Sequence, residues 1–185
     1  MNTSNSKWFA LPMFDSCAAS PTLILFSLLF FSIMLVGAIY DLFTYTIPNF
    51  LPLFLIGTFA AFALWQALPW PLLAAHAGAG LGMLVAGWVL FALGLLGGGD
   101  AKLFAATSLW MGWHGLLNYL IMFSLCGGIL ALSLLLFRRL PLLERLARHG
   151  WIATLHDKAQ GVPYGIALAA GAMLAWPDLL TVPGQ

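Results

Sequence analysis

Residues 22–40 read TLILFSLLFFSIMLVGAIY, contain no charged side chain and are followed directly by Asp41. A helix that crosses a bilayer needs about 20 mainly apolar residues. This stretch therefore predicts a transmembrane helix. No basic cluster precedes it and no small-residue cleavage site follows it, so we expect no removable signal peptide.

The composition extends this interpretation to the rest of the chain. Of the 185 residues, 62% are hydrophobic and only 7% are charged, whereas about a quarter of an ordinary soluble domain is charged. We therefore expect an all-α, polytopic membrane protein whose residues 1–185 form one membrane-embedded domain, with an N-terminal tail at 1–21 and a loop at about 138–160. A net charge of +1 argues against nucleic-acid binding. The implied partner is the lipid bilayer.

Five further apolar segments bring the expected number of transmembrane helices to about six. They cover residues 50–68, 72–96, 101–113, 116–137 and 162–176. The segment 101–113 is short for a full crossing, so it could be a tilted or half-buried helix.

The basic residues predict the orientation of these helices. Five of the seven lie in the loop 138–160, namely Arg138, Arg139, Arg145, Arg148 and Lys158. The positive-inside rule places such a loop in the cytoplasm. By parity, the breaks after the first and third spans, which carry Asp41 and Asp100, also face the cytoplasm.

Charge is otherwise almost absent from the apolar part of the chain. Outside the loop and the two tails, the charged residues are Asp41, Asp100 and Lys102. A charge at membrane depth costs about 2.5 to 3.5 kcal/mol on insertion scales, so it usually marks a functional site. Two carboxyl groups held close together share one proton and so provide an acid and a base. Such a pair could activate water to hydrolyse a peptide bond without a metal.

The segment Gly97-Gly98-Gly99-Asp100-Ala101-Lys102 gives the second aspartate an open backbone. Glycines let another chain approach closely, so a substrate strand could lie here. The spacing does not match GxxxxGK[ST], so we reject a phosphate-binding loop.

Three motifs together resemble the type IV prepilin peptidases, which are membrane aspartyl proteases with a GxGD motif. Asp41 is followed by Ile47-Pro48-Asn49, Gly97 to Leu103 is similar to GxGD-x-K-L, and Pro163-Tyr164-Gly165 is similar to the family's Pro-Tyr/Phe-Gly signature. The resemblance is to the short form associated with Flp or tight-adherence pili. It spans nearly the whole membrane portion of the chain.

The resemblance implies an aspartic endopeptidase that removes the leader of a prepilin or pseudopilin at the cytoplasmic face of the bacterial inner membrane. Asp41 and Asp100 would be the catalytic pair. Supporting or substrate-binding positions would be Gly97, Gly99, Lys102, Pro48, Asn49, Pro163, Tyr164 and Gly165. The longer members carry a cysteine-paired cytoplasmic insert and methylate the new N-terminus; this chain has no such insert, so we predict cleavage without N-methylation.

Family members often carry arginines between the first aspartate and Ile-Pro-Asn, whereas this chain has Phe43, Tyr45 and Thr46. This departure leaves contacts to lipid headgroups or to a substrate that depends on basic residues in doubt. Lys102 could act on a neighbouring carboxylate, hold a substrate carboxylate or a phosphate, or be a cation that snorkels to the interface. We expect Pro48 to position the second span and Asn49 to cap it.

The remaining polar residues predict no cofactor and no metal. Cys17 and Cys126 are far apart and show no CxxC spacing. We expect His76, His114, His149 and His156 to be solvent-facing or interfacial. The loop 138–160 could bind anionic lipid as an amphipathic helix, or it could contact the substrate or a pilus assembly component.

A rival function is a small proton- or ion-coupled transporter component that uses paired carboxylates. It explains the aspartates but not the GxGD motif. Many transporters also contain an internal repeat, and this sequence has no convincing one.

Overall fold

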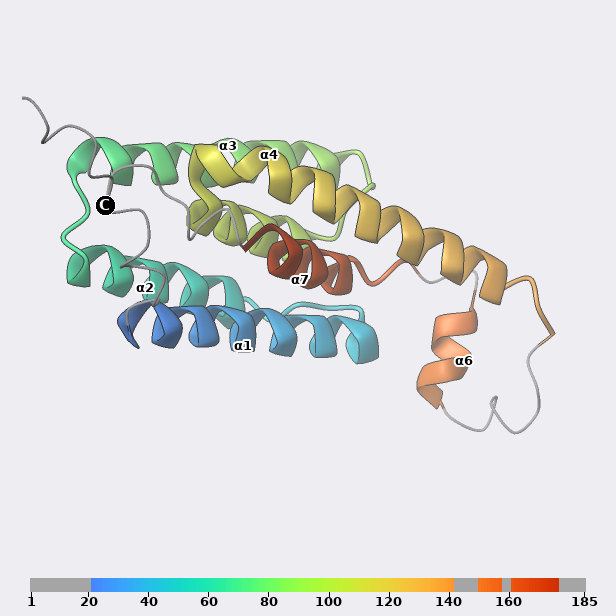
Figure 1. The fold of residues 1–185 in the computed structure, drawn as a ribbon. Coiled ribbons are helices and arrows are strands. Elements are labelled where there is room, and N and C mark those ends of the chain that lie inside the picture. Colours follow the sequence, from blue (N-terminus) through green and yellow to red (C-terminus); the bar gives the residue numbers. More distant parts are fainter. Residues whose placement is uncertain (1–20, 142–149, 158–160, 177–185) are drawn as a thin grey trace, which may run out of the picture.

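The computed structural model describes residues 21–141, 150–157 and 161–176. Within these ranges the regular structure is entirely helical (Figure 1). The helices are α1 (Pro21–Thr44), α2 (Phe50–Trp65), α3 (Trp70–Ala92), α4 (Gly98–Phe137), α6 (Gly150–His156) and α7 (Tyr164–Ala175). The all-α prediction is confirmed.

The helices have the length and surface of a membrane protein. By length and composition, α1, α3 and α4 could each cross a bilayer, and α2 and α7 are shorter apolar helices. Large apolar side chains such as Leu53, Val85 and Leu125 are more than half exposed on the outer faces. A soluble monomer rarely carries so much apolar surface, so this chain is a membrane protein.

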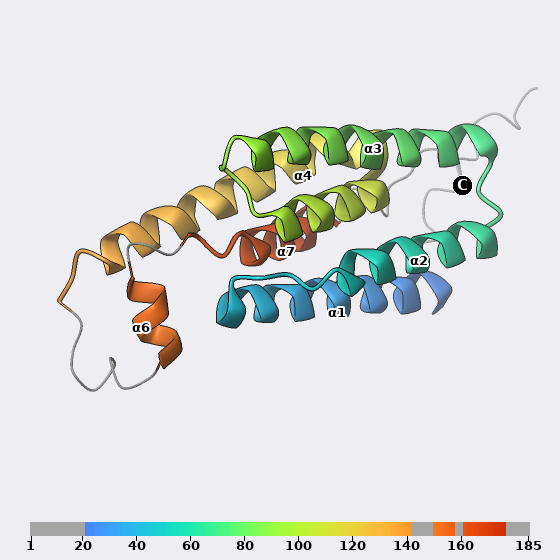
Figure 2. The same cartoon turned by 180° about the vertical axis from the view of Figure 1, so that it is seen from behind.

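The long helix α4 is broken at Gly112, where φ is 59° and ψ is −177°. Only glycine adopts this conformation readily. Figures 1 and 2 show that the parts of α4 before and after the break run in opposite directions. The two parts correspond to the expected spans 101–113 and 116–137, and the chain turns where a connection was predicted.

His76 packs against this turn, because a Cβ at Gly112 would lie 2.9 Å from its ring. Its Nδ1 is 2.8 Å from the carbonyl oxygen of Leu109. His76 is therefore not a solvent-facing side chain, because its ring is partly buried against α4; its predicted place at the membrane interface stays a prediction.

Two other expectations about the helices need correction. Asp41 and Asp100 lie inside α1 and α4 rather than in breaks, because α1 continues to Thr44 and α4 begins at Gly98. The described helices also include α6, a short helix within the loop 138–160, while α4 combines two expected spans. Arg145, Arg148 and Lys158, on which the predicted orientation partly depends, lie outside the described residues.

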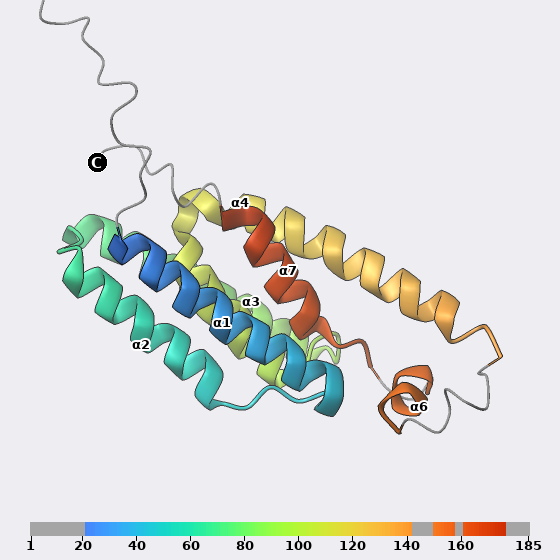
Figure 3. The ribbon, with the colours of Figure 1, turned by 60° about the horizontal axis from the view of Figure 1, so that its bottom comes forward.

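The packing places α7 between α1 and the second part of α4 (Figure 3). The two helices α4 and α7 approach at backbone distance, since a Cβ at Gly171 would lie 2.7 Å from the backbone nitrogen of Phe123. Across the bundle, α3 packs chiefly on α4, and α2 packs on α4 and α1. The C-terminal end of α1 and the N-terminal ends of α4 and α7 meet at one end of the bundle.

Candidate active site

Asp41 lies in the last turn of α1 and is only 3% exposed. Its Oδ2 accepts a hydrogen bond from the backbone N–H of Gly165, at 2.6 Å, in the first turn of α7. A Cβ at Gly165 would lie 2.8 Å from the Cβ of Asp41. Glycine is therefore the residue that lets α7 approach closely enough for its amide to hold this carboxylate.

Asp100 is the third residue of α4 after the N-cap, Gly97, and is 8% exposed. Its carboxylate forms a hydrogen bond with the backbone of Gly97, as acidic residues at this helix position often do. A Cβ at Gly97 would lie 2.7 Å from Asp100 Oδ2, so a side chain there would push the carboxylate away. The other oxygen, Oδ1, is buried and has no hydrogen-bond partner among the described residues.

The fold brings these two carboxyl groups into one buried site, where they interact electrostatically. Like charges in a buried site repel, so the pair readily keeps one proton. The site therefore contains one potential base, one potential acid and an oxygen of Asp100 without a hydrogen-bond partner among the described residues. No three His, Cys, Asp or Glu side chains of the described ranges are grouped to hold a metal.

The segment 45–49 connects Asp41 to α2 and packs against the start of α4. The amide of Tyr45 donates to the carbonyl oxygen of Asp41 at 2.9 Å, and Tyr45 has a φ of 52°, which is unusual outside glycine. A Cβ at Gly99 would lie 3.0 Å from both the Cβ and the carbonyl oxygen of Ile47. Ile47 thus supports the turn that carries Asp100. Sequence reasoning assigned it no role, although it belongs to the Ile-Pro-Asn motif.

Asn49 and Lys102 contact each other rather than the two aspartates. Asn49 directly precedes α2, but its side chain forms no capping hydrogen bond, so the predicted capping role is wrong. Its Oδ1 instead accepts a hydrogen bond from Lys102 Nζ at 2.8 Å. Pro48 positions α2 through its carbonyl oxygen, which accepts from the amide of Leu51 at 3.1 Å.

The Pro-Tyr-Gly motif reaches the site through its glycine alone. Pro163 is fully buried and precedes α7. The ring of Tyr164 points toward α4, where a Cβ at Gly127 would lie 3.8 Å from it. Of the three residues, only Gly165 contacts an aspartate.

Similar proteins point to one family. The sequence profile of the type IV leader peptidase family matches residues 28–132, which include both aspartates. The prepilin leader peptidase/N-methyltransferase of Aeromonas salmonicida (strain A449) is 32% identical over 88 residues, and that of Aeromonas hydrophila is 31% identical over 88 residues. Each match covers 46% of this chain and 25% of the relative, so the chain matches about a quarter of the length of these curated relatives. No solved structure matches the chain.

The family match covers more than half of the chain and contains the two buried carboxylates described above. On this ground, the chain belongs to the type IV leader peptidase family.

Proposed function

We propose that this protein is a membrane aspartyl endopeptidase that cleaves the leader of type IV, Flp-like pilin precursors, with Asp41 and Asp100 as its catalytic pair. The observation that carries this proposal is the burial of two carboxyl groups that interact electrostatically, with no hydrogen-bond partner for Asp100 Oδ1 among the described residues. A structural role alone would not require two carboxylates to be held together away from water, since burying charge is costly.

The two aspartates have distinguishable roles in this mechanism. Asp41, whose Oδ2 receives the Gly165 amide, is the ionised member, because such a hydrogen bond favours the charged form. Asp41 takes a proton from water as the water oxygen attacks the scissile carbonyl carbon. Asp100 carries the shared proton and donates it to the carbonyl oxygen as charge develops there.

The second half of the reaction returns both groups to their starting state. The carbonyl double bond re-forms, and Asp100 recovers its proton from the former carbonyl oxygen. The carbon–nitrogen bond breaks, and the proton on Asp41 goes to the leaving amine. The products are the leader, with a new carboxyl end, and the mature precursor, with a free amine.

The same end of the bundle carries Arg138, one of the basic residues that favour a cytoplasmic location. Arg138 follows α4 and donates hydrogen bonds to the carbonyl oxygens of Leu155 and Gly161, both at 2.9 Å. Gly161 is four residues before Gly165, which contacts Asp41. By the positive-inside rule we propose that the site faces the cytoplasm at the inner membrane.

The finer substrate claims rest on the sequence. The curated relatives are named for both peptidase and methyltransferase activities, but this chain lacks the cysteine-paired insert of the longer family members. We therefore propose that it leaves the new N-terminus unmethylated. Mass spectrometry of the mature product tests this, because one added methyl group would contradict it.

The decisive experiment compares cleavage of a Flp-like pilin precursor by the wild-type protein, Asp41→Asn and Asp100→Asn in membranes. Asparagine keeps the shape of the side chain and removes the acid. We therefore expect the rate of cleavage by each variant to fall at least about 1,000-fold. Asp157→Asn, an exposed position in the loop, is the matched control. If either variant of this aspartate pair (the dyad) cleaves normally, with its membrane insertion verified, the result would contradict the mechanism and favour the transporter function.

A further inference from the structure

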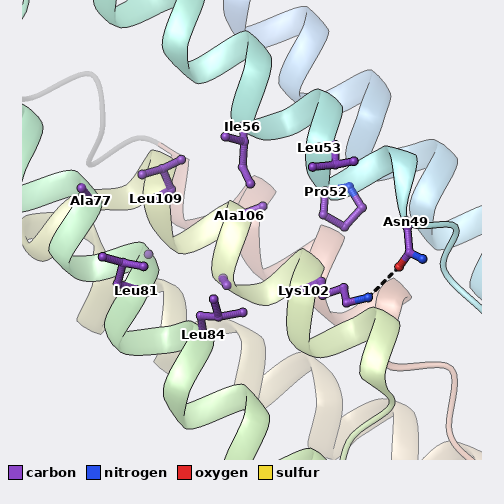
Figure 4. A pocket seen from close by; sticks show the side chains of 12 residues that line it. Asn49, Pro52, Leu53, Ile56, Ala77, Leu81, Leu84, Lys102, Ala106 and Leu109 are labelled. Atoms are coloured by element: carbon purple, nitrogen blue, oxygen red, sulfur yellow. Dashed lines mark hydrogen bonds between the residues drawn. The ribbon is translucent and has the colours of Figure 1, made fainter.

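A cavity lies between α2 and α3 and over the first part of α4 (Figure 4). Its volume is about 500 Å³. Small residues such as Gly80 and Ala106 form its floor, and exposed apolar side chains such as Leu53 and Leu84 form its rim. The mechanism above uses none of these residues. We call this cavity the α2–α3 groove.

The groove is apolar along its length and polar only at one end. That end carries Lys102 and Asn49, joined by the 2.8 Å hydrogen bond, as Figure 4 shows. Lys102 is exposed, and it forms no ion pair with any carboxylate of the described chain. A cation at the end of an apolar channel in a membrane has an anionic group as its natural partner.

The floor of the groove is suited to a helix. The hydrophobic effect does not drive helices together inside a lipid bilayer. Membrane helices therefore associate where small residues let their backbones come close. Ala77 on α3 and Ala105 and Ala106 on α4 provide such a surface over two adjacent helices, which Gly80 lets pack closely on each other. A helix lying there would place side chains between Leu53 on one rim and Leu84 on the other, which is the helix-in-groove mode of recognition.

The polar end of the groove lies close to the two aspartates along the chain, since it is formed by Lys102 and Asn49. Lys102 follows Asp100 by two residues, about 3 Å along the helix axis, and side chains at this spacing point to different sides of a helix. Asn49 closes the segment 45–49, which begins four residues after Asp41 and packs through Ile47 on Gly99. A substrate chain that leaves the groove at Lys102 would therefore pass only the segment 45–49 and the first turn of α4 before it reaches the two aspartates.

We propose that the α2–α3 groove binds the apolar helix of the precursor, and that Lys102 pairs with a carboxylate in the first turns of that helix. The pairing sets the register of the precursor, so that the extended chain preceding the helix places its scissile bond at the dyad. This inference rests on the proposed peptidase function. It assigns Lys102 and the groove to substrate positioning and not to the chemical step.

Cross-linking in an inactive protein tests the groove without requiring cleavage. A photo-activated phenylalanine analogue at Leu84, in the Asp100→Asn background, is expected to capture the precursor through its apolar helix. The same analogue at Leu125 on the second part of α4, which is 56% exposed against 43% for Leu84, is the control and is expected to capture little. Capture of lipid alone at Leu84, or equal capture at both positions, would overturn the proposal.

Exchange of charge tests the role of Lys102. Lys102→Gln is expected to raise KM at least 10-fold while kcat changes less than 3-fold. Lys102→Glu is expected to lose cleavage of the native precursor, and to recover at least 10-fold of it when the acidic residue of the precursor helix is replaced by lysine. An unchanged KM, or no recovery in the exchanged pair, would contradict the pairing.

Bulky substitutions at the rim of the groove test the groove proposal separately from the proposed peptidase function. Leu53→Trp and Leu84→Trp are expected to raise KM at least 10-fold, whereas Leu125→Trp leaves it unchanged. If the wild-type protein cleaves the precursor but both rim variants match it, the groove proposal fails and the peptidase stands. If the wild-type protein does not cleave, the proposed function itself fails.

Discussion

The two sides of the bundle are packed in different ways. On one side α7 approaches its neighbours closely: a Cβ at Gly165 would lie 2.8 Å from the Cβ of Asp41 on α1, and a Cβ at Gly171 would lie 2.7 Å from the backbone nitrogen of Phe123 on α4. Toward α2 and α3, a groove of about 500 Å³ remains. The close contact holds the carboxylate of Asp41, whereas the groove ends at Lys102. The difference indicates that this bundle is tight where geometry must be fixed and open where another helix could bind.

The largest effect on cleavage is expected when the close contact of α7 with Asp41 is disrupted at Gly165. Gly165→Ala would place a methyl group 2.8 Å from the Cβ of Asp41, so α7 must retreat and the 2.6 Å hydrogen bond must lengthen. We expect cleavage to fall at least about 100-fold, as misplacement of about 1 Å can cause. Gly161→Ala, four residues earlier and with open space around it, is the control and should retain activity. Comparable cleavage by the two variants would refute this account of Gly165.

A smaller effect is expected from Gly171, which lies on the same tight side but away from the dyad. The alanine Cβ would meet the backbone of Phe123 at 2.7 Å, and such overpacking typically costs about 1 to 3 kcal/mol. The measurement is the free energy of unfolding in detergent micelles. Gly128→Ala, which faces open space on α4, should differ little from the wild-type protein. Equal stabilities would show that α7 adjusts freely.

The smallest effect is expected at Ile56, on the side of α2 that faces the groove, and its buried neighbour Leu55 provides the comparison. Ile56 lines the groove and is 45% exposed, whereas Leu55 is fully buried. Leu55→Ala should lower the free energy of unfolding by about 2 to 5 kcal/mol, and Ile56→Ala by much less. Unfolding in micelles without precursor measures both. A similar loss at the two positions would mean that the groove closes in the free protein.

Much of this comparison could not be predicted from the sequence. Hydropathy located the apolar segments, and the turn near residue 112 was expected between two of them. Hydropathy does not report where helical hydrogen bonding ends, however, so Asp41 and Asp100 were assigned to breaks although both lie in terminal helical turns. The groove depends on how three helices cross, which no local pattern encodes.

The sequence indicated which residues belong to the candidate site, but it did not indicate which of them contact one another. The sequence identified Asp41, Asp100 and the glycines near them, because charge is rare in apolar segments. It did not indicate that the amide of Gly165 binds Asp41, since the two residues are 124 positions apart. Nor did it indicate that Asn49 contacts Lys102 instead of capping α2, because an asparagine before a helix usually suggests a cap.

The bond between Asp41 and Gly165 also has a consequence for biogenesis. Asp41 is synthesised 124 residues before the amide that holds it, and α7 is the last of the described helices. A nascent chain that has inserted α1 to α4 already contains both aspartates but lacks the contact that orients the first. On the proposed function, the nascent chain is therefore inactive until α7 inserts between its neighbours and the Gly165 amide reaches Asp41.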